Sequence, residues 1–179
     1  MHFVKYLLIC VIAIFANNAL ACSFVGGAKP FHPTLKRWQQ HAGPAQKTNG
    51  AKGDYWERVP QPIVKVIEIT RGTTAPGSEC SDAGTISLEI SLPKSSTYSI
   101  SEFAFYFRVQ SGQLPDAIFP DAPLVGVIKD GKAQIFLAWL DGHPSTQLPL
   151  DLKVEMFLVT NDLKIGASTF FEVKDGKGG

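Results

Sequence analysis

The stretch TISLEISL, residues 85–92, alternates apolar and polar residues without interruption, with the apolar positions at Ile86, Leu88, Ile90 and Leu92. Successive side chains of a strand point to opposite faces, so the stretch predicts a strand with one face in a core and the other towards water. Antiparallel sheets commonly hold such half-buried strands. The pattern therefore favours an antiparallel β fold.

Six further stretches combine alternation or β-branched residues with flanking turn residues. They predict strands over Ile63–Thr70, Phe103–Val109, Leu124–Ile128, Ala133–Leu140, Leu152–Leu158 and Thr169–Val173. Asp130-Gly131 predicts a tight hairpin turn, because both central positions of such a turn take positive φ.

Seven short strands without a long amphipathic helix predict an all-β fold, a two-sheet antiparallel β-sandwich. The two sheets are expected to hide one shared core that includes Ile86, Leu88, Phe105, Leu137 and Val154.

The strand pattern over residues 63–179 resembles the immunoglobulin-like and fibronectin type III superfamily of β-sandwiches. The segment Leu152–Val173, with its turn at Thr160–Lys164, is similar to the final hairpin of a fibronectin type III module. The resemblance implies an Ig-like sandwich of about seven strands. It implies no activity, because such folds carry many unrelated functions.

The first 21 residues are typical of a secretory signal peptide. Lys5 precedes the apolar run Tyr6–Ala16, and a short polar segment ends in the Ala-Leu-Ala of residues 19–21. The run is too short for a membrane-spanning helix, which needs about 20 apolar residues. We expect an exported protein of bacterial type, located in the periplasm or at the cell surface.

Residues 22–62 are rich in Gly and Pro and predict an irregular N-terminal arm, with one possible short helix over Pro33–Ala42. The arm carries a net charge of +4 and residues 63–179 a net charge of −4, so the arm either binds an anionic partner or lies against its own body. The mature chain is neutral, which argues against nucleic-acid binding.

Cys22 and Cys80 remain after the signal peptide is removed, and an oxidising compartment favours a disulfide between them. Residues 19–22, Ala-Leu-Ala-Cys, also resemble the lipobox of bacterial lipoproteins. In that alternative a lipid on Cys22 anchors the protein to a membrane and leaves Cys80 as a thiol.

Residues for catalysis or metal binding are few. His143 lies in a predicted turn, Asp116 and Asp121 are acidic loop residues, and His32 and His41 are nine positions apart in the arm. Turns commonly contain such residues, and no short metal-ligand spacing is present. We expect no enzymatic activity and no cofactor. A periplasmic metal-binding carrier and a weak loop-based hydrolase are the alternatives.

The strand Ala133–Leu140 is apolar on both faces, which is unusual for a strand that meets water. Its second face and those of neighbouring strands carry aromatic residues, and we expect an outward patch formed by Tyr106, Phe136, Phe157 and Phe170. Either the arm covers this patch, or a partner protein or a glycan binds it. The sequence therefore predicts an exported binding or accessory module of the cell envelope, with a protein as the expected partner.

Overall fold

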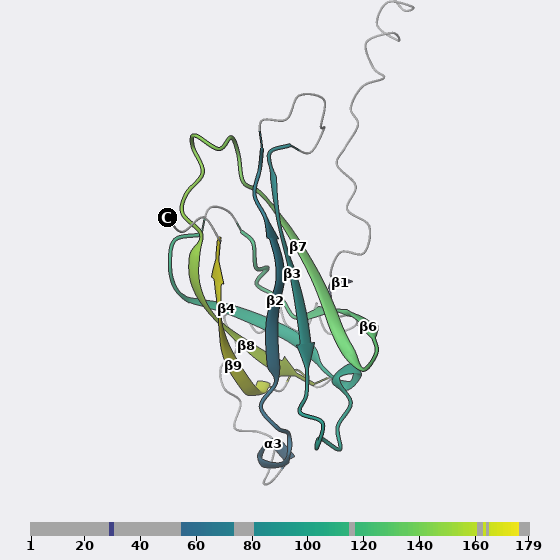
Figure 1. Cartoon of the computed structure of the whole chain (residues 1–179). Coiled ribbons are helices and arrows are strands. Elements are labelled where there is room, and N and C mark those ends of the chain that lie inside the picture. Colours follow the sequence, from purple (N-terminus) through teal and green to yellow (C-terminus); the bar gives the residue numbers. More distant parts are fainter. Residues whose placement is uncertain are drawn as a thin grey trace, which may run out of the picture.

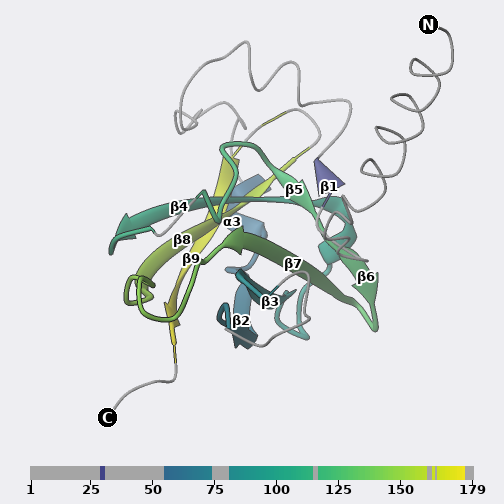
Figure 2. The same cartoon turned by 90° about the horizontal axis from the view of Figure 1, so that it is seen from above.

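The chain folds into two facing antiparallel sheets, as the computed structural model shows (Figure 1). The structure describes residues 29–30, 55–73, 81–114, 117–160, 163 and 165–175. One sheet has the strand order β1-β5-β4-β8-β9, and the other has the order β2-β3-β7-β6. Seen from above, β4 and β8 lie in one layer, and β2, β3 and β7 lie in the other (Figure 2). The predicted all-β two-sheet sandwich is confirmed.

The strands follow the predicted segments closely, except for β1, which lies in the arm that was predicted to be irregular. They are β1 (Lys29–Pro30), β2 (Ile63–Thr70), β3 (Ala83–Ser91), β4 (Ala104–Ser111), β5 (Leu124–Val125), β6 (Val127–Lys129), β7 (Lys132–Leu140), β8 (Asp151–Val159) and β9 (Ile165–Lys174).

The alternation that identified β3 also determines its burial. Ile86, Leu88 and Ile90 are buried, whereas the residues between them are half-buried. The register pairs Ile86 with Leu137 and Leu88 with Ile135 of β7, so the apolar side chains of both strands share one face. That face meets the inner face of the five-stranded sheet.

The predicted shared core is confirmed. Its five expected members belong to one cluster of buried residues, which are Ile86, Leu88, Phe105, Leu137 and Val154. Phe105 is fully buried, and Phe107 lies edge-on to Phe171 of β9. Burying a side chain of this size stabilises the fold by about 1.5–3 kcal/mol. The core therefore extends across β3, β7, β4, β8 and β9.

The expected single strand over Leu124–Ile128 was wrong. Leu124 pairs with Phe105 in the five-stranded sheet, whereas Val127 and Ile128 pair with β7 in the other sheet. Gly126 lies between the two pairings, and a Cβ atom there would be 2.7 Å from the backbone oxygen of Gln134. The chain changes sheets at a residue that has no side chain to clash.

The predicted hairpin at Asp130-Gly131 is confirmed. Asp130 has φ 51° and Gly131 has φ 71°, so both central residues take the left-handed conformation that this turn requires. The turn joins β6 to β7 and pairs Lys129 with Lys132. Through this hairpin, β6 becomes the edge strand of the four-stranded sheet.

Two short helical segments were not predicted. They are α3 (Tyr55–Arg58) and a 3-10 helix over Ile100–Glu102, which begins at a capping box between Ser99 and Glu102. The predicted helix over Pro33–Ala42, the signal segment 1–21, Cys22 and Cys80 all lie outside the described residues. Within the described ranges, no helix is long and apolar enough to cross a membrane.

Candidate functional site

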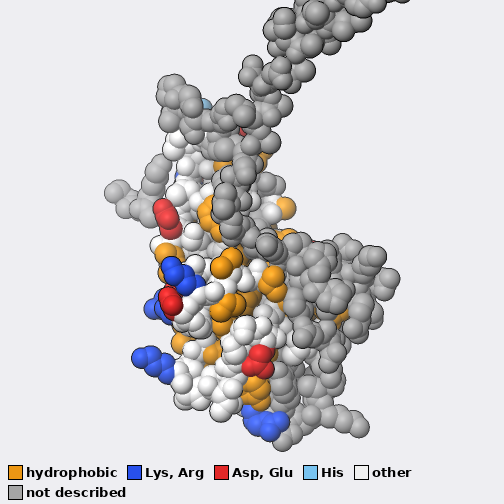
Figure 3. All heavy atoms as spheres, turned by 90° about the vertical axis from the view of Figure 1, so that its right-hand side faces the viewer, with side chains coloured by type: hydrophobic (Ala, Val, Ile, Leu, Met, Phe, Trp, Pro, Cys, Tyr) orange, Lys and Arg blue, Asp and Glu red, His pale blue; other side chains and the backbone are white. Residues whose placement is uncertain are grey.

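Exposed apolar side chains are concentrated on the four-stranded sheet. Among the described residues, seven large apolar side chains are exposed, and five of them lie on β2, β6 and β7: Ile63, Ile67, Val127, Ile128 and Leu140. Figure 3 shows hydrophobic side chains gathered on the side of the molecule where β6 lies in Figure 1. Contiguous exposed apolar surface commonly marks a binding site.

The outer face of this sheet is hollowed along its centre. Ser87 of β3 lies in register with Glu68 of β2 on one side and Phe136 of β7 on the other. Because the serine side chain is small, a groove of about 450 Å³ remains above β3, lined by Ile67, Ser87, Leu88, Glu89, Val127, Gln134, Ile135 and Phe136. The groove therefore has apolar walls and a partly polar floor.

A bulge in β2 forms one wall of the groove. The register shifts between Val66 and Glu68, so Ile67 is an extra residue in the ladder and 60% of its side chain is exposed. An extra residue bends the strand and redirects side chains. Here the strand's alternation points Ile67 outward, and the shift brings Glu68 to the same face beside it.

The charges on this face are balanced. Lys132 Nζ lies 2.9 Å from Glu89 Oε1 across β7 and β3. Lys65 and Glu68 lie on β2, and Lys129 ends β6. The outer face therefore has no strong charge of one sign that would select a highly charged ligand.

The four residues of the predicted patch do not share one surface. Phe136 is on the four-stranded sheet, whereas Tyr106, Phe157 and Phe170 are on the outer face of the five-stranded sheet. Tyr106 and Phe157 are buried with their ring centroids 6.3 Å apart, and Phe170 is 54% exposed. The expectation of one patch was wrong, because alternation does not reveal which sheet a strand joins.

Tyr106 and Phe157 belong to a second, smaller core on the outside of the five-stranded sheet. It also contains Ala104, Val159 and Ile165, with Ala122, Val125 and Leu163 packed against it. Tyr106 Oη donates a hydrogen bond of 2.8 Å to Asp121 Oδ1. Burial, together with this hydrogen bond to a carboxylate, raises the pKa of Tyr106 to about 12.

The remaining outer face of the five-stranded sheet is mainly polar. Lys153 Nζ lies 5.1 Å from the ring centroid of Phe170, and Glu155 accepts hydrogen bonds from Gln110 and Ser168. Arg108 lies over the ring of Phe157 at 5.2 Å. This region therefore lacks the continuous apolar character of the opposite face.

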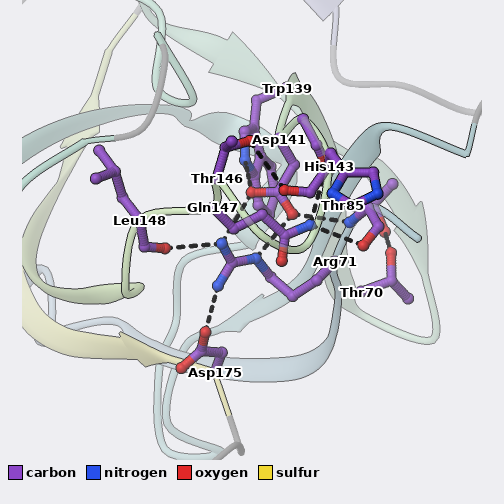
Figure 4. A network of polar contacts seen from close by, with 12 residues as sticks. Thr70, Arg71, Thr85, Trp139, Asp141, His143, Thr146, Gln147, Leu148 and Asp175 are labelled. Atoms are coloured by element: carbon purple, nitrogen blue, oxygen red, sulfur yellow. Dashed lines mark hydrogen bonds and ion pairs between the residues drawn. The ribbon is translucent and has the colours of Figure 1, made fainter. Parts of the chain in front are cut away.

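A buried polar network at one end of the sandwich was not predicted. Asp141, directly after β7, accepts hydrogen bonds from Arg71, from the backbone N–H of Gly72 and from Trp139 Nε1 (Figure 4). Arg71 also donates to Asp175 and to the backbone oxygen of Leu148.

These contacts join the ends of β2 and β7 to the segments that flank β8 and β9. Burial alone would raise the pKa of Asp141, but hydrogen bonds from Arg71, Gly72 and Trp139 lower it below its ordinary value. The hydrogen bond to Asp141 raises the pKa of Arg71. Arg71 and Asp141 neutralise each other's charge, so the network holds strand ends together. The sequence signal for this network was Arg71 directly after β2 and Asp141 directly after β7.

The candidate catalytic residues do not form a site among the described residues. His143 is exposed in a turn, where its Nδ1 lies 2.7 Å from Ser145 Oγ and accepts from the backbone N–H of Ser145. Asp121 is the partner of Tyr106, and Asp116, His32 and His41 lie outside the described residues. In the ranges that the structure describes, no group of three His, Cys, Asp or Glu side chains could hold a metal ion.

A scan against protein-family models finds no match to this chain, and neither the curated proteins nor the solved structures contain a significant match.

Proposed function

We propose that this chain is an exported, non-catalytic binding module of the cell envelope that contacts a protein through the outer face of its four-stranded sheet. The observation that carries the proposal is a groove of about 450 Å³ on this face, lined by the exposed Ile67 of β2 and Val127 of β6 and by Phe136 of β7. Protein surfaces with this character are typically covered by another protein.

A protein partner fits this surface better than a glycan does. The most exposed residues are aliphatic: Ile67, Val127 and Leu140 are 60%, 53% and 65% exposed. Aliphatic side chains pack against other apolar side chains, whereas stacking on a sugar ring requires an exposed aromatic face. Tyr106 and Phe157, two of the aromatic candidates, are buried.

The strand order supports an Ig-like assignment within this proposal. In one sheet β2, β3, β7 and β6 lie side by side in this order, as strands A, B, E and D do in an immunoglobulin sheet. In the other sheet β4, β8 and β9 lie side by side like strands C, F and G. Ig-like sandwiches commonly serve as binding modules, although the fold alone does not define a partner.

Export is supported by the signal-like order of residues 1–21. Intact mass and N-terminal sequencing of the mature protein test it: we expect a chain that begins at Cys22. A mature chain that retains Met1 would contradict export. A gain of two hydrogens on reduction would indicate the Cys22–Cys80 disulfide, and acyl mass on Cys22 would indicate the lipid anchor instead.

Site-specific photo-crosslinking in the intact envelope tests the binding face. A photoreactive residue at Val127 is expected to crosslink to a protein, and the same residue at Phe170 serves as the matched control on the other sheet. The two positions have similar exposure, 53% and 54%. Equal yields at both positions, or a product from Phe170 alone, would contradict the proposed face.

A further inference from the structure

We propose that the protein bound by the outer face of the four-stranded sheet is a second copy of this chain, and that the two copies form a weak two-fold dimer. This inference rests on the proposed function, because it identifies the partner of the same face. Its support comes from the arrangement of side chains across the face, from the balance of charge and from the available area.

The face presents complementary shapes on opposite sides of β3. Glu68, Ser87 and Phe136 lie in one row across β2, β3 and β7, and the bulged Ile67 lies next to Glu68 in this row. A two-fold axis that runs along β3 above Ser87 places Ile67 of each copy over Phe136 of the other. The contact is therefore made twice, as an isologous interface requires.

The centre of this arrangement has room for the inserted side chains. Ser87 is the small residue between the two walls, and the groove above it has a volume of about 450 Å³. Each Ile67 would lie between Phe136 and Val127 of the other copy. Two sheets packed face to face stand about 10 Å apart, a distance that interdigitated side chains fill.

The charges permit the face to meet itself. The face and its terminal hairpin carry Lys65, Lys129 and Lys132 against Glu68, Glu89 and Asp130. Glu89 would approach its own symmetry mate near the axis, but each Glu89 pairs with Lys132 in its own copy at 2.9 Å. A face of one sign would repel a second copy, whereas this balanced face does not.

The area of the face suits a weak dimer. β2 has eight residues and β3 and β7 have nine each, so with β6 they cover roughly 480 Å² of flat surface at the usual strand spacing and rise. Side-chain relief increases the accessible area of this surface. A specific interface needs about 500 Å² from each partner, and one of about 800 Å² is standard. We therefore expect weak, reversible association, as is typical of interfaces at the low end of the size range.

Sedimentation equilibrium of the mature protein tests the dimer, with the protein itself as the probe. We expect the average mass to rise towards twice that of one chain between about 1 and 100 µM. Ile67→Glu should weaken the association at least tenfold, because it places a carboxylate against Phe136 of the other copy. Phe170→Glu is the matched control and should leave the association unchanged, because Phe170 lies on the opposite sheet.

A cysteine at the axis gives an independent readout. Ser87→Cys should give a covalent dimer with a bis-maleimide crosslinker that spans the roughly 10 Å between the two sheets, whereas Ser168→Cys on β9 should give no more of this product than the unchanged protein. A protein that stays monomeric at all concentrations, or a dimer that tolerates Ile67→Glu and gives no Ser87→Cys crosslink, would overturn the inference. In either case, a crosslink from Val127 to a different protein would still support the proposed function.

Discussion

Arg71 and Asp141 are joined by two parallel hydrogen bonds, from Arg71 Nε to Asp141 Oδ2 at 2.8 Å and from Arg71 Nη2 to Asp141 Oδ1 at 2.9 Å. Their side chains are 9% and 0% exposed. The pair joins the residue after β2 to the residue after β7, two strands that have β3 between them in the same sheet. Because Arg71 also reaches Asp175 after β9, this contact joins the two sheets at one end of the sandwich.

Asp141→Asn should strongly destabilise the protein. The change removes the carboxylate that accepts two hydrogen bonds from Arg71 and leaves Asp175 as its remaining charged partner. Breaking a buried pair costs up to about 3–5 kcal/mol. The free energy of unfolding in urea measures the loss. Asp151→Asn is the matched control: its carboxylate is exposed and 3.7 Å from Lys174, so the change should cost less than about 1 kcal/mol. Equal losses for both variants would show that the buried pair has no special role.

The same carboxylate should make the protein sensitive to acid. The pKa of Asp141 is lower in the folded state than its ordinary value of 3.8, so its contribution to stability is present above pH 4 and is lost as the pH falls through the lowered value.

Urea midpoints measured from pH 7 down to pH 2 check this dependence. Below pH 4 the free energy of unfolding should fall less steeply in Asp141→Asn than in the unchanged protein. The difference in slope has an upper limit of about 1.4 kcal/mol per pH unit, the value for one proton. Parallel curves would contradict the assignment of this proton to Asp141.

Tyr106→Phe should lower the free energy of unfolding by about 1 kcal/mol, because it removes the hydrogen bond to Asp121 and leaves the ring in place. The change should also remove the tyrosine that ionises at about pH 12. Ultraviolet absorbance of tyrosinate at pH 11, with circular dichroism to confirm the fold, should therefore be nearly the same in both proteins. A clear loss of tyrosinate signal in the variant would show that Tyr106 ionises like an exposed tyrosine.

Gly84→Ala should destabilise the protein by about 1–3 kcal/mol. Gly84 lies opposite Trp139 in the β3–β7 ladder, and an added Cβ atom would overlap the indole ring. The ring cannot move without disturbing its hydrogen bond of 3.1 Å to Asp141. Thermal unfolding followed by tryptophan fluorescence measures the effect. Ser87→Ala, on the outer face of the same strand, should change stability by less than about 0.5 kcal/mol.

The sequence was sufficient to locate most of the strands. Period-two alternation is a local property of the chain, and it directly reflects which side chains enter the core. It predicted the buried residues of β3, and the Asp130-Gly131 turn followed from backbone conformations that those two residues tolerate.

The candidate site was only partly predictable. The outward apolar face of β7 was expected, and Phe136 does line the groove. The partners of this face were missed: a bulge brings Glu68 to the outer face beside Ile67, and Val127 joins them because the chain changes sheets at Gly126. Neither the bulge in β2 nor the change of sheet at Gly126 is marked by a periodic pattern in the sequence.

By itself, the sequence determined which segments become strands, which face of each strand is apolar and where the tight hairpin turns. Only the tertiary structure decided which sheet each strand joins. That choice placed Phe136 on one outer face and buried Tyr106 and Phe157 on the other, and it brought Arg71 to Asp141. The physical reason is that alternation depends on neighbouring residues, whereas strand pairing depends on hydrogen bonds and packing between residues far apart in the chain.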